Sequence, residues 1–141
     1  MEIKLIVHAK DLLPFMDVLK KQKVLAIDTE TTGLDPHTQR VRLIQIAWTE
    51  DFVLVIDCFS FLAEGTHLLK EVLETAAVKV FQNAKFDLQF LIALWIYPTL
   101  IFDTMLAAQI LHSSGAPDRV NLKSLAQHYL NEDLNKTEQK S

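Results

Sequence analysis

Residues 24–33 read VLAIDTETTG, an apolar run that ends in two carboxylates and a glycine. Apolar residues occupy both faces of the extended segment 24–29, which is typical of a central strand covered on both sides. Asp28 and Glu30 are two residues apart at the end of this strand, so we expect their side chains to leave the same face. Gly33 and Pro36 within residues 31–39 indicate that a loop follows.

The elements predicted around this strand alternate between the two types of secondary structure. Apolar, β-branched composition predicts further strands over residues 3–7, 41–49, 52–57 and 78–81. Apolar residues at helical spacing predict helices over residues 10–20, 61–75, 83–96, 104–112 and 122–130. Asn83, Asp103 and Asn121 are the expected N-caps of the last three helices. The order predicts a mixed α/β sheet flanked by helices.

Composition limits the classes of protein that fit this sequence. The chain has 141 residues, of which 50% are hydrophobic and 23% charged, and this predicts one globular domain. A net charge of −4 argues against a protein that holds nucleic acid mainly through a broad basic surface. The longest apolar run, residues 90–96, is too short to span a membrane, and Cys58 is the single cysteine. We therefore expect a cytoplasmic protein.

The pair Asp28 and Glu30 allows two interpretations. Neighbouring carboxylates repel each other unless a cation lies between them, and oxygen ligands suit Mg²⁺ or Mn²⁺ better than zinc. The first interpretation is therefore a metal site. The second is a solvated strand end with a capping glutamate.

A second stretch, FQNAKFDL at residues 81–88, places an acid within an apolar helix. A buried, ionised Asp87 would need a partner, because uncompensated burial of a charge costs several kcal/mol. Lys85 is two residues away and does not share its helix face. A metal shared with Asp28 and Glu30 would compensate the charge. Alternatively, Asp87 faces solvent near the helix N-terminus, where the helix dipole favours an acid.

Together these stretches resemble a known family. DTETTGLDP at residues 28–36 and FQNAKFDLQFL at residues 81–91 are similar to the first two motifs of the DEDD 3'–5' exonucleases. FDTMLAAQIL at residues 102–111 and the segment 120–141 resemble the branch that contains ribonuclease D and the proofreading domain of DNA polymerase I. The resemblance covers essentially all of residues 1–141 and implies a ribonuclease-H-like fold in a single exonuclease-like domain.

The resemblance also implies roles for individual residues. Asp28, Glu30 and Asp87 would be the catalytic ligands of two divalent ions, Mg²⁺ or Mn²⁺. The pocket for the 3'-terminal nucleotide would be lined by Thr29, Leu34, Asn83 and Phe86. Asp103 matches a family position that is not a metal ligand, so we keep it as a helix cap.

A third family motif, a Tyr or His a few residues before a fourth carboxylate, is expected beyond the equivalent of Ser141. We therefore expect a domain that lacks its C-terminal helices relative to the family. His128 and Asp133 have the spacing of the histidine variant of this motif and are the candidates for a substitute. The other interpretation is that His128 is a surface residue of a helix and Asp133 part of a polar loop.

The predicted function is a metal-dependent 3'–5' exonuclease that hydrolyses phosphodiester bonds at the 3' end of single-stranded DNA or RNA. The alternative is a non-catalytic or split nucleic-acid-binding fragment. In that case a homodimer or a partner chain would cover the incomplete C-terminal side and supply the third motif. Trp48 and Trp95 are expected to pack in the core.

Overall fold

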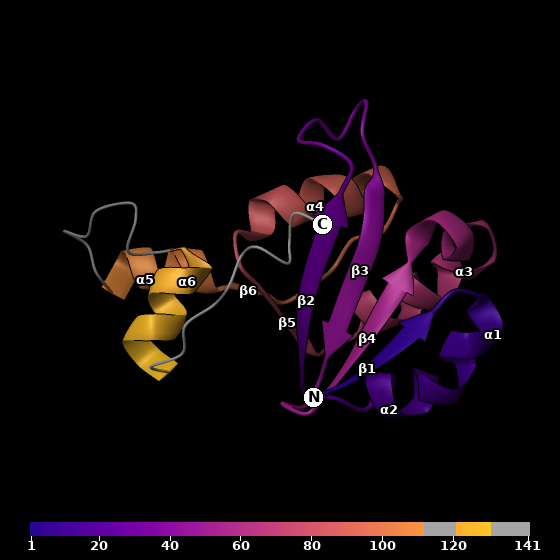
Figure 1. Cartoon of the computed structure of the whole chain (residues 1–141), viewed down its shortest axis with the longest axis horizontal. Helices are drawn as coiled ribbons and strands as arrows, with labels where there is room; N and C mark the ends of the chain where they lie inside the picture. Colours follow the sequence, from indigo (N-terminus) through magenta and orange to yellow (C-terminus); the bar gives the residue numbers. More distant parts are fainter. Residues whose placement is uncertain (112–120, 131–141) are drawn as a thin grey trace.

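The computed structural model describes residues 1–111 and 121–130, which form one six-stranded mixed sheet with helices around it (Figure 1). The strands lie in the order β1-β4-β3-β2-β5-β6. β2 pairs antiparallel with β3, and β3 with β4, whereas the other neighbours are parallel. Their bounds are Glu2–Ile6 (β1), Val24–Thr31 (β2), Val41–Ala47 (β3), Phe52–Asp57 (β4), Val78–Phe81 (β5) and Ile101–Asp103 (β6). The predicted fold class is thus confirmed.

Four helices, α1 to α4, pack into the same hydrophobic core as the sheet, and α5 and α6 lie beyond β6 (Figure 1). The predicted helix 10–20 is divided into α1, a 3₁₀ turn η1 that contains Pro14, and α2. The predicted helix 122–130 is α6 followed by a π-helical turn, η3. The bounds are Ala9–Leu12 (α1), Leu13–Phe15 (η1), Met16–Lys20 (α2), Cys58–Leu73 (α3), Ala84–Ala93 (α4), Thr104–Leu111 (α5), Leu122–Leu125 (α6) and Ala126–Leu130 (η3).

The two faces of the sheet differ in burial. Leu25 and Ile27 of β2 point into the core, while Val24 and Ala26 of the same strand are exposed. The expectation that this strand is covered on both faces is therefore wrong for the part of the chain that the structure describes. Residues of one strand alternate between the two faces, and α1 to α4 cover the face that contains Leu25 and Ile27.

The helix that begins after Asn83 is shorter than predicted. It ends at Ala93, where the N–H groups of Trp95 and Ile96 bond to the carbonyls of Ile92 and Leu91. This pair of bonds closes the helix around Trp95, which adopts the left-handed conformation with φ 62°. The Trp95 side chain is 73% exposed, so the expectation that it packs in the core is wrong. Trp48 does pack beside the core, with its ring centroid 5.3 Å from that of Phe52.

The connection after Trp95 leads into β6, a strand that the sequence analysis does not predict. β6 has three residues and pairs with β5. Because β5 and β6 are parallel, both end at the edge of the sheet where α4 and α5 begin. In the described residues, no helix is long and apolar enough to cross a membrane.

Candidate active site

Two of the predicted acids lie in the second half of β2. Asp28 pairs across the antiparallel ladder with Gln45, and Glu30 with Leu43. The register shifts between Glu30 and Thr31, which marks an irregularity where the strand leaves the sheet. Asp28 is exposed and Glu30 half-buried, so solvent reaches both residues.

Asp87 comes from α4 and meets the same strand. It lies in the first turn of α4 and is 3% exposed. The hydroxyl group of Thr29 donates a hydrogen bond to its Oδ1 atom. Thr29 lies between Asp28 and Glu30 in the sequence, so this bond brings Asp87 to the strand that contains the other two acids. The alternative in which Asp87 faces solvent is wrong, because the start of α4 packs against the core.

The electrostatics of these acids is unusual. Burial raises the pKa of Asp87 to about 7, and the negative charges of Asp28, Asp103 and Glu30 act in the same direction, against the bond from Thr29. Partial burial raises the pKa of Asp28. It also raises the pKa of Glu30, with a further contribution from the charge of Asp28. Each acid therefore resists ionisation, and a bound cation would relieve this cost.

The donor set fits a hard divalent cation in its chemistry. All three predicted ligands supply carboxylate oxygens, which Mg²⁺ and Mn²⁺ prefer. Within residues 1–111 and 121–130, however, no three histidine, cysteine or acidic side chains converge closely enough to hold an ion as they stand. Asp87 instead accepts the bond from Thr29. The three acids therefore lie in one region, but their carboxylates do not converge on a common cation position.

The residues predicted to line a nucleotide pocket lie around this region in different environments. Leu34 is 83% exposed in the loop between β2 and β3. Phe86 is half-buried in the first turn of α4, with its ring 5.2 Å from that of Phe90. Thr29 is buried, and its hydroxyl contacts Asp87. The backbone of His128 belongs to η3, and Asp133 lies outside the described residues.

Asn83 occupies the N-cap position of α4 but does not cap it with its side chain. The backbone there is left-handed, with φ 61° and ψ 61°. The cap comes from Asp103, whose carboxylate accepts hydrogen bonds from the N–H groups of Asn83 and Ala84. Asp103 also caps its own helix α5, as predicted. The second role was missed because no local pattern shows that the end of β6 lies beside the start of α4.

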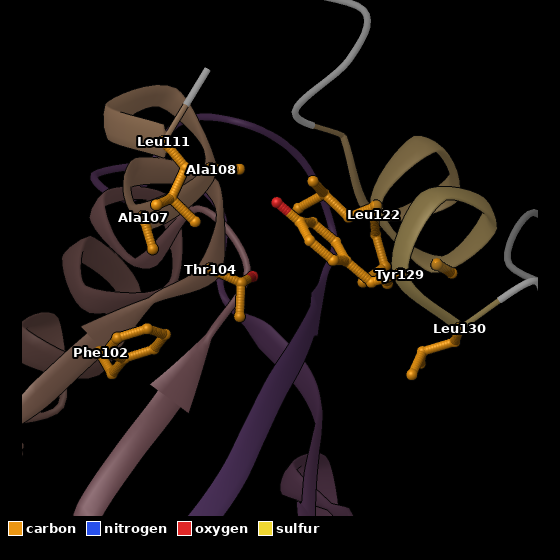
Figure 2. A pocket seen from close by; sticks show the side chains of 10 residues that line it. Phe102, Thr104, Ala107, Ala108, Leu111, Leu122, Tyr129 and Leu130 are labelled. Carbon is orange, nitrogen blue, oxygen red and sulfur yellow. The ribbon is translucent and has the colours of Figure 1, made fainter. Parts of the chain in front are cut away.

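A separate apolar pocket of about 340 Å³ lies between α5 on one side and α6 with η3 on the other (Figure 2). Figure 2 shows Leu122 and Tyr129 opposite Ala107 and Leu111. Its lining consists of Phe102, Thr104, Ala107, Ala108, Leu111, Leu122, Leu125, Ala126, Tyr129 and Leu130. None of these residues is one of the three predicted ligands, so the pocket is distinct from the acidic region.

Comparison with known proteins identifies relatives along nearly the whole chain. The sequence profile of a family described as 3'-5' exonuclease matches residues 4–141. A DNA polymerase of Mycobacterium phage D29 is 41% identical over 93 residues, which cover 63% of this chain and 15% of that protein. DNA polymerase I of Aquifex aeolicus is 32% identical over 123 residues, which cover 87% of this chain and 19% of that protein. The chain thus spans about a fifth or less of the length of these relatives.

Solved structures share the fold. The catalytic core of RRP6 from Trypanosoma brucei matches with a TM-score of 0.85 at 26% identity, over 99% of this chain and 38% of that one. NrnC from Brucella melitensis, solved with bound Mg²⁺, matches with a TM-score of 0.79 at 27% identity, over 97% of this chain and 66% of that one. NrnC has also been solved with bound pGG. Since the family profile matches all but the first three residues, this chain belongs to the 3'–5' exonuclease family, within the DEDD superfamily.

Proposed function

We propose that this chain is a metal-dependent 3'–5' exonuclease that shortens single-stranded nucleic acid from its 3' end. The observation that supports this most directly is the burial of Asp87 beside Asp28 and Glu30, in a chain of the exonuclease family. A buried acid whose pKa is raised by burial and by the charges of nearby acids is costly for a fold to keep, and such sites are candidates for function. A purely structural carboxylate would have a cationic or N–H partner to offset its burial.

In this proposal Asp28, Glu30 and Asp87 are the ligands of the divalent ions. Bound Mg²⁺ or Mn²⁺ would activate a water and stabilise the leaving 3' oxygen. Asp28 and Glu30 approach from β2, and Asp87 approaches from the start of α4, where Thr29 orients its carboxylate. Hydrolysis adds the water oxygen to phosphorus and breaks the bond between phosphorus and the 3' oxygen. The products are a nucleoside 5'-monophosphate and a chain with a new 3' hydroxyl.

The substrate contacts are proposed on the residues around these acids. Leu34 is exposed where the loop leaves β2, and a base can stack against it. Asn83 and Phe86 lie at the start of α4, on either side of the turn that leads to Asp87. We propose DNA as the preferred substrate because the sequence relatives described above are DNA polymerases. The Mg²⁺ bound in NrnC supports the choice of cation.

The test is the degradation of 5'-labelled single-stranded DNA and RNA by the full chain, with Mg²⁺, Mn²⁺ or a chelator. Wild-type protein should shorten the DNA from its 3' end only when the cation is present. Asp87→Asn and Asp28→Asn should each lower the rate on the order of 1,000-fold, because each removes a ligand without a large change of shape. Glu64→Gln is the matched control, since Glu64 is an exposed acid of α3.

The results separate the proposal from its alternative. Equal shortening by wild type and Asp87→Asn would reveal a contaminating nuclease. A folded wild-type protein without activity in either metal would favour the split or non-catalytic fragment. Faster degradation of RNA than of DNA would support the proposed reaction but overturn the proposed preference for DNA.

A further inference from the structure

Asp103 is buried at the end of β6, and its carboxylate joins the starts of two helices. Oδ1 accepts hydrogen bonds from the N–H groups of Asn83 at 3.0 Å and of Met105 at 2.9 Å. Oδ2 accepts from the N–H of Ala84 at 2.8 Å. The bond from Met105 is the ordinary N-cap of α5, the helix that follows Asp103. The other two bonds reach a different helix, α4, which begins at Ala84.

The two bonds to α4 satisfy N–H groups that the helix itself cannot pair. The first N–H groups of any helix have no carbonyl partner within it, and at α4 the N-cap side chain of Asn83 does not provide one. Asp103 therefore holds the left-handed turn at Asn83 and the first residue of α4 against the end of β6. Thr104 adds a second connection, because its hydroxyl lies within hydrogen-bond distance of the Gln82 side-chain oxygen and of the Phe81 carbonyl, the latter at 3.2 Å.

Asp87 lies three residues after Ala84, within this anchored turn. Its carboxylate is fixed from the other side by the hydroxyl of Thr29. We infer that Asp103 is a positioning residue: it holds the first turn of α4 so that Asp87 stays beside Asp28 and Glu30. This inference rests on the proposed function, because it concerns the placement of a proposed metal ligand.

The competing explanation is that Asp103 only stabilises the fold, as helix caps do. Asp57 offers the comparison for this case. It also ends a strand, β4, and is the N-cap of the following helix, α3, where its Oδ1 accepts from the N–H of Phe59 at 3.2 Å. That bond stays within the helix that Asp57 itself begins. Serine is about as good an N-cap as aspartate, but its shorter side chain cannot also reach a second helix.

The experiment compares Asp103→Ser with Asp57→Ser in the full chain. Mn²⁺ affinity is measured by calorimetry at a temperature where thermal unfolding curves show each variant to be folded. Asp103→Ser should lower the affinity on the order of 10-fold, the lower end of the effect of removing a group that orients metal ligands. Asp57→Ser should leave it within twofold of wild type. A cap that only stabilises the fold would not change the affinity of the folded protein.

The Thr29–Asp87 contact provides a readout that needs no metal. Nuclear Overhauser effects between these side chains should weaken in Asp103→Ser and persist in Asp57→Ser. Unchanged Mn²⁺ affinity in folded Asp103→Ser would overturn the inference. If wild type binds no Mn²⁺, the proposed function fails, and the Thr29–Asp87 contact alone decides the role of Asp103. If Asp103→Ser does not fold, Asp103→Asn replaces it, since it retains Oδ1 and loses only the acceptor for Ala84.

Discussion

A buried ionisable side chain lies near each end of β5, Lys79 at one end and Asp87 at the other. Their neighbours differ. At the start of the strand, Lys79 is fully buried, and its ammonium donates to the carbonyl of Thr75 and, at 3.3 Å, to the hydroxyl of Thr99. Beyond the end of the strand, the negative charges of Asp28, Asp103 and Glu30 act on the buried Asp87. Burial lowers the pKa of Lys79, and the negative charge of Glu74 partly offsets this.

The difference distinguishes a charge that the fold itself satisfies from one that its neighbours make more costly. The acceptors around Lys79 are neutral groups of the protein itself, and they connect the end of α3 to the loop before β6. The acidic neighbours of Asp87 increase the cost of its charge, whereas the hydrogen bond from Thr29 reduces it. A fold selected only for stability would not keep such a group. We therefore expect substitutions at Lys79 to change stability, and substitutions at Asp87 to change activity.

The largest effect is expected from Lys79→Ala. Removing a long buried side chain leaves a cavity, and we expect the free energy of unfolding to fall by about 3 kcal/mol. Lys79→Met fills the same space and should cost less than about 1.5 kcal/mol. It leaves the Thr75 carbonyl paired, because the Thr99 hydroxyl also donates to it at 3.0 Å.

Urea unfolding of wild type and both variants measures these differences. An equal loss in Lys79→Met and Lys79→Ala would mean that the charge itself stabilises the fold. The description of Lys79 as a buried aliphatic chain with a satisfied end would then be wrong.

The pH dependence of stability should be opposite to that of an ordinary salt-bridged acid. The pKa of Asp87 in the folded protein is about 7, above the ordinary value of 3.8 for an aspartate, so the folded protein binds this proton more tightly than the unfolded chain does. The stabilisation that comes from this tighter proton binding is fully present below about pH 4 and is lost as the pH rises through 7. Between pH 5 and pH 8, in the presence of a chelator, the free energy of unfolding of wild type should fall by roughly 2 kcal/mol more than that of Asp87→Asn.

Urea unfolding at pH 5 and pH 8 measures this. Asparagine can still accept the bond from Thr29, so the variant keeps the local geometry. Parallel pH profiles of wild type and Asp87→Asn would show that ionisation of the buried Asp87 does not destabilise the fold. Asp87 would then not differ from Lys79 in this respect.

The sequence predicts the elements that carry Asp28 and Asp87 better than it predicts contacts between distant elements. The apolar run before Asp28 and the helical pattern after Asn83 are local, and both elements begin where expected. The pairing of β6 with β5 and the reach of Asp103 to α4 depend on residues about 20 positions apart, which no periodicity shows. Lys79 reads as a polar residue in a four-residue strand, and only the fold shows what accepts its hydrogen bonds.

A smaller effect is expected from the left-handed residues at the two ends of α4. Trp95, just after α4, has φ 62°, and Asn83, just before α4, has φ 61°. A left-handed conformation costs roughly 1–2 kcal/mol for most residues, and asparagine tolerates it better. Trp95→Gly should therefore stabilise the protein by about 1 kcal/mol, whereas Asn83→Gly should change its stability little. Trp95→Ala is the control, because it removes the ring and keeps the Cβ atom. A gain in Trp95→Ala equal to that in Trp95→Gly would assign the effect to the exposed indole.

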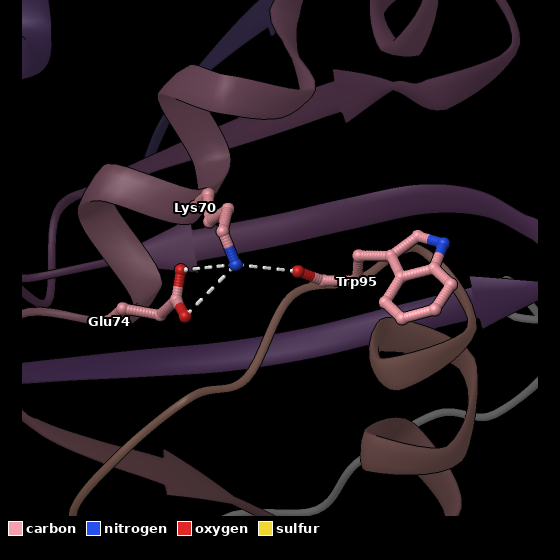
Figure 3. A network of polar contacts seen from close by, with 3 residues as sticks. All are labelled: Lys70, Glu74 and Trp95. Carbon is pink, nitrogen blue, oxygen red and sulfur yellow. Dashed lines mark hydrogen bonds and ion pairs between the residues drawn. The ribbon is translucent and has the colours of Figure 1, made fainter.

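The smallest effect is expected from Glu74→Gln. Glu74 pairs with Lys70 at 3.1 Å one turn earlier in the chain, and Lys70 also donates to the Trp95 carbonyl at 2.7 Å (Figure 3). The pair is partly exposed, so its loss should cost no more than about 0.5 kcal/mol. Salt at 1 M should remove most of this cost, because screening then acts over about 3 Å. Urea unfolding in low and high salt measures both.

Glu74 also acts on Lys79, whose pKa its charge raises. A buried interaction is screened much less than an exposed one. If Glu74→Gln costs more than about 1 kcal/mol and the cost persists in 1 M salt, the source is the buried Lys79 rather than the exposed Lys70. In that case the Thr75 carbonyl and the Thr99 hydroxyl do not suffice to stabilise the buried ammonium of Lys79. Lys79 would then depend on a carboxylate in the way that, in the proposed function, Asp87 would depend on a cation.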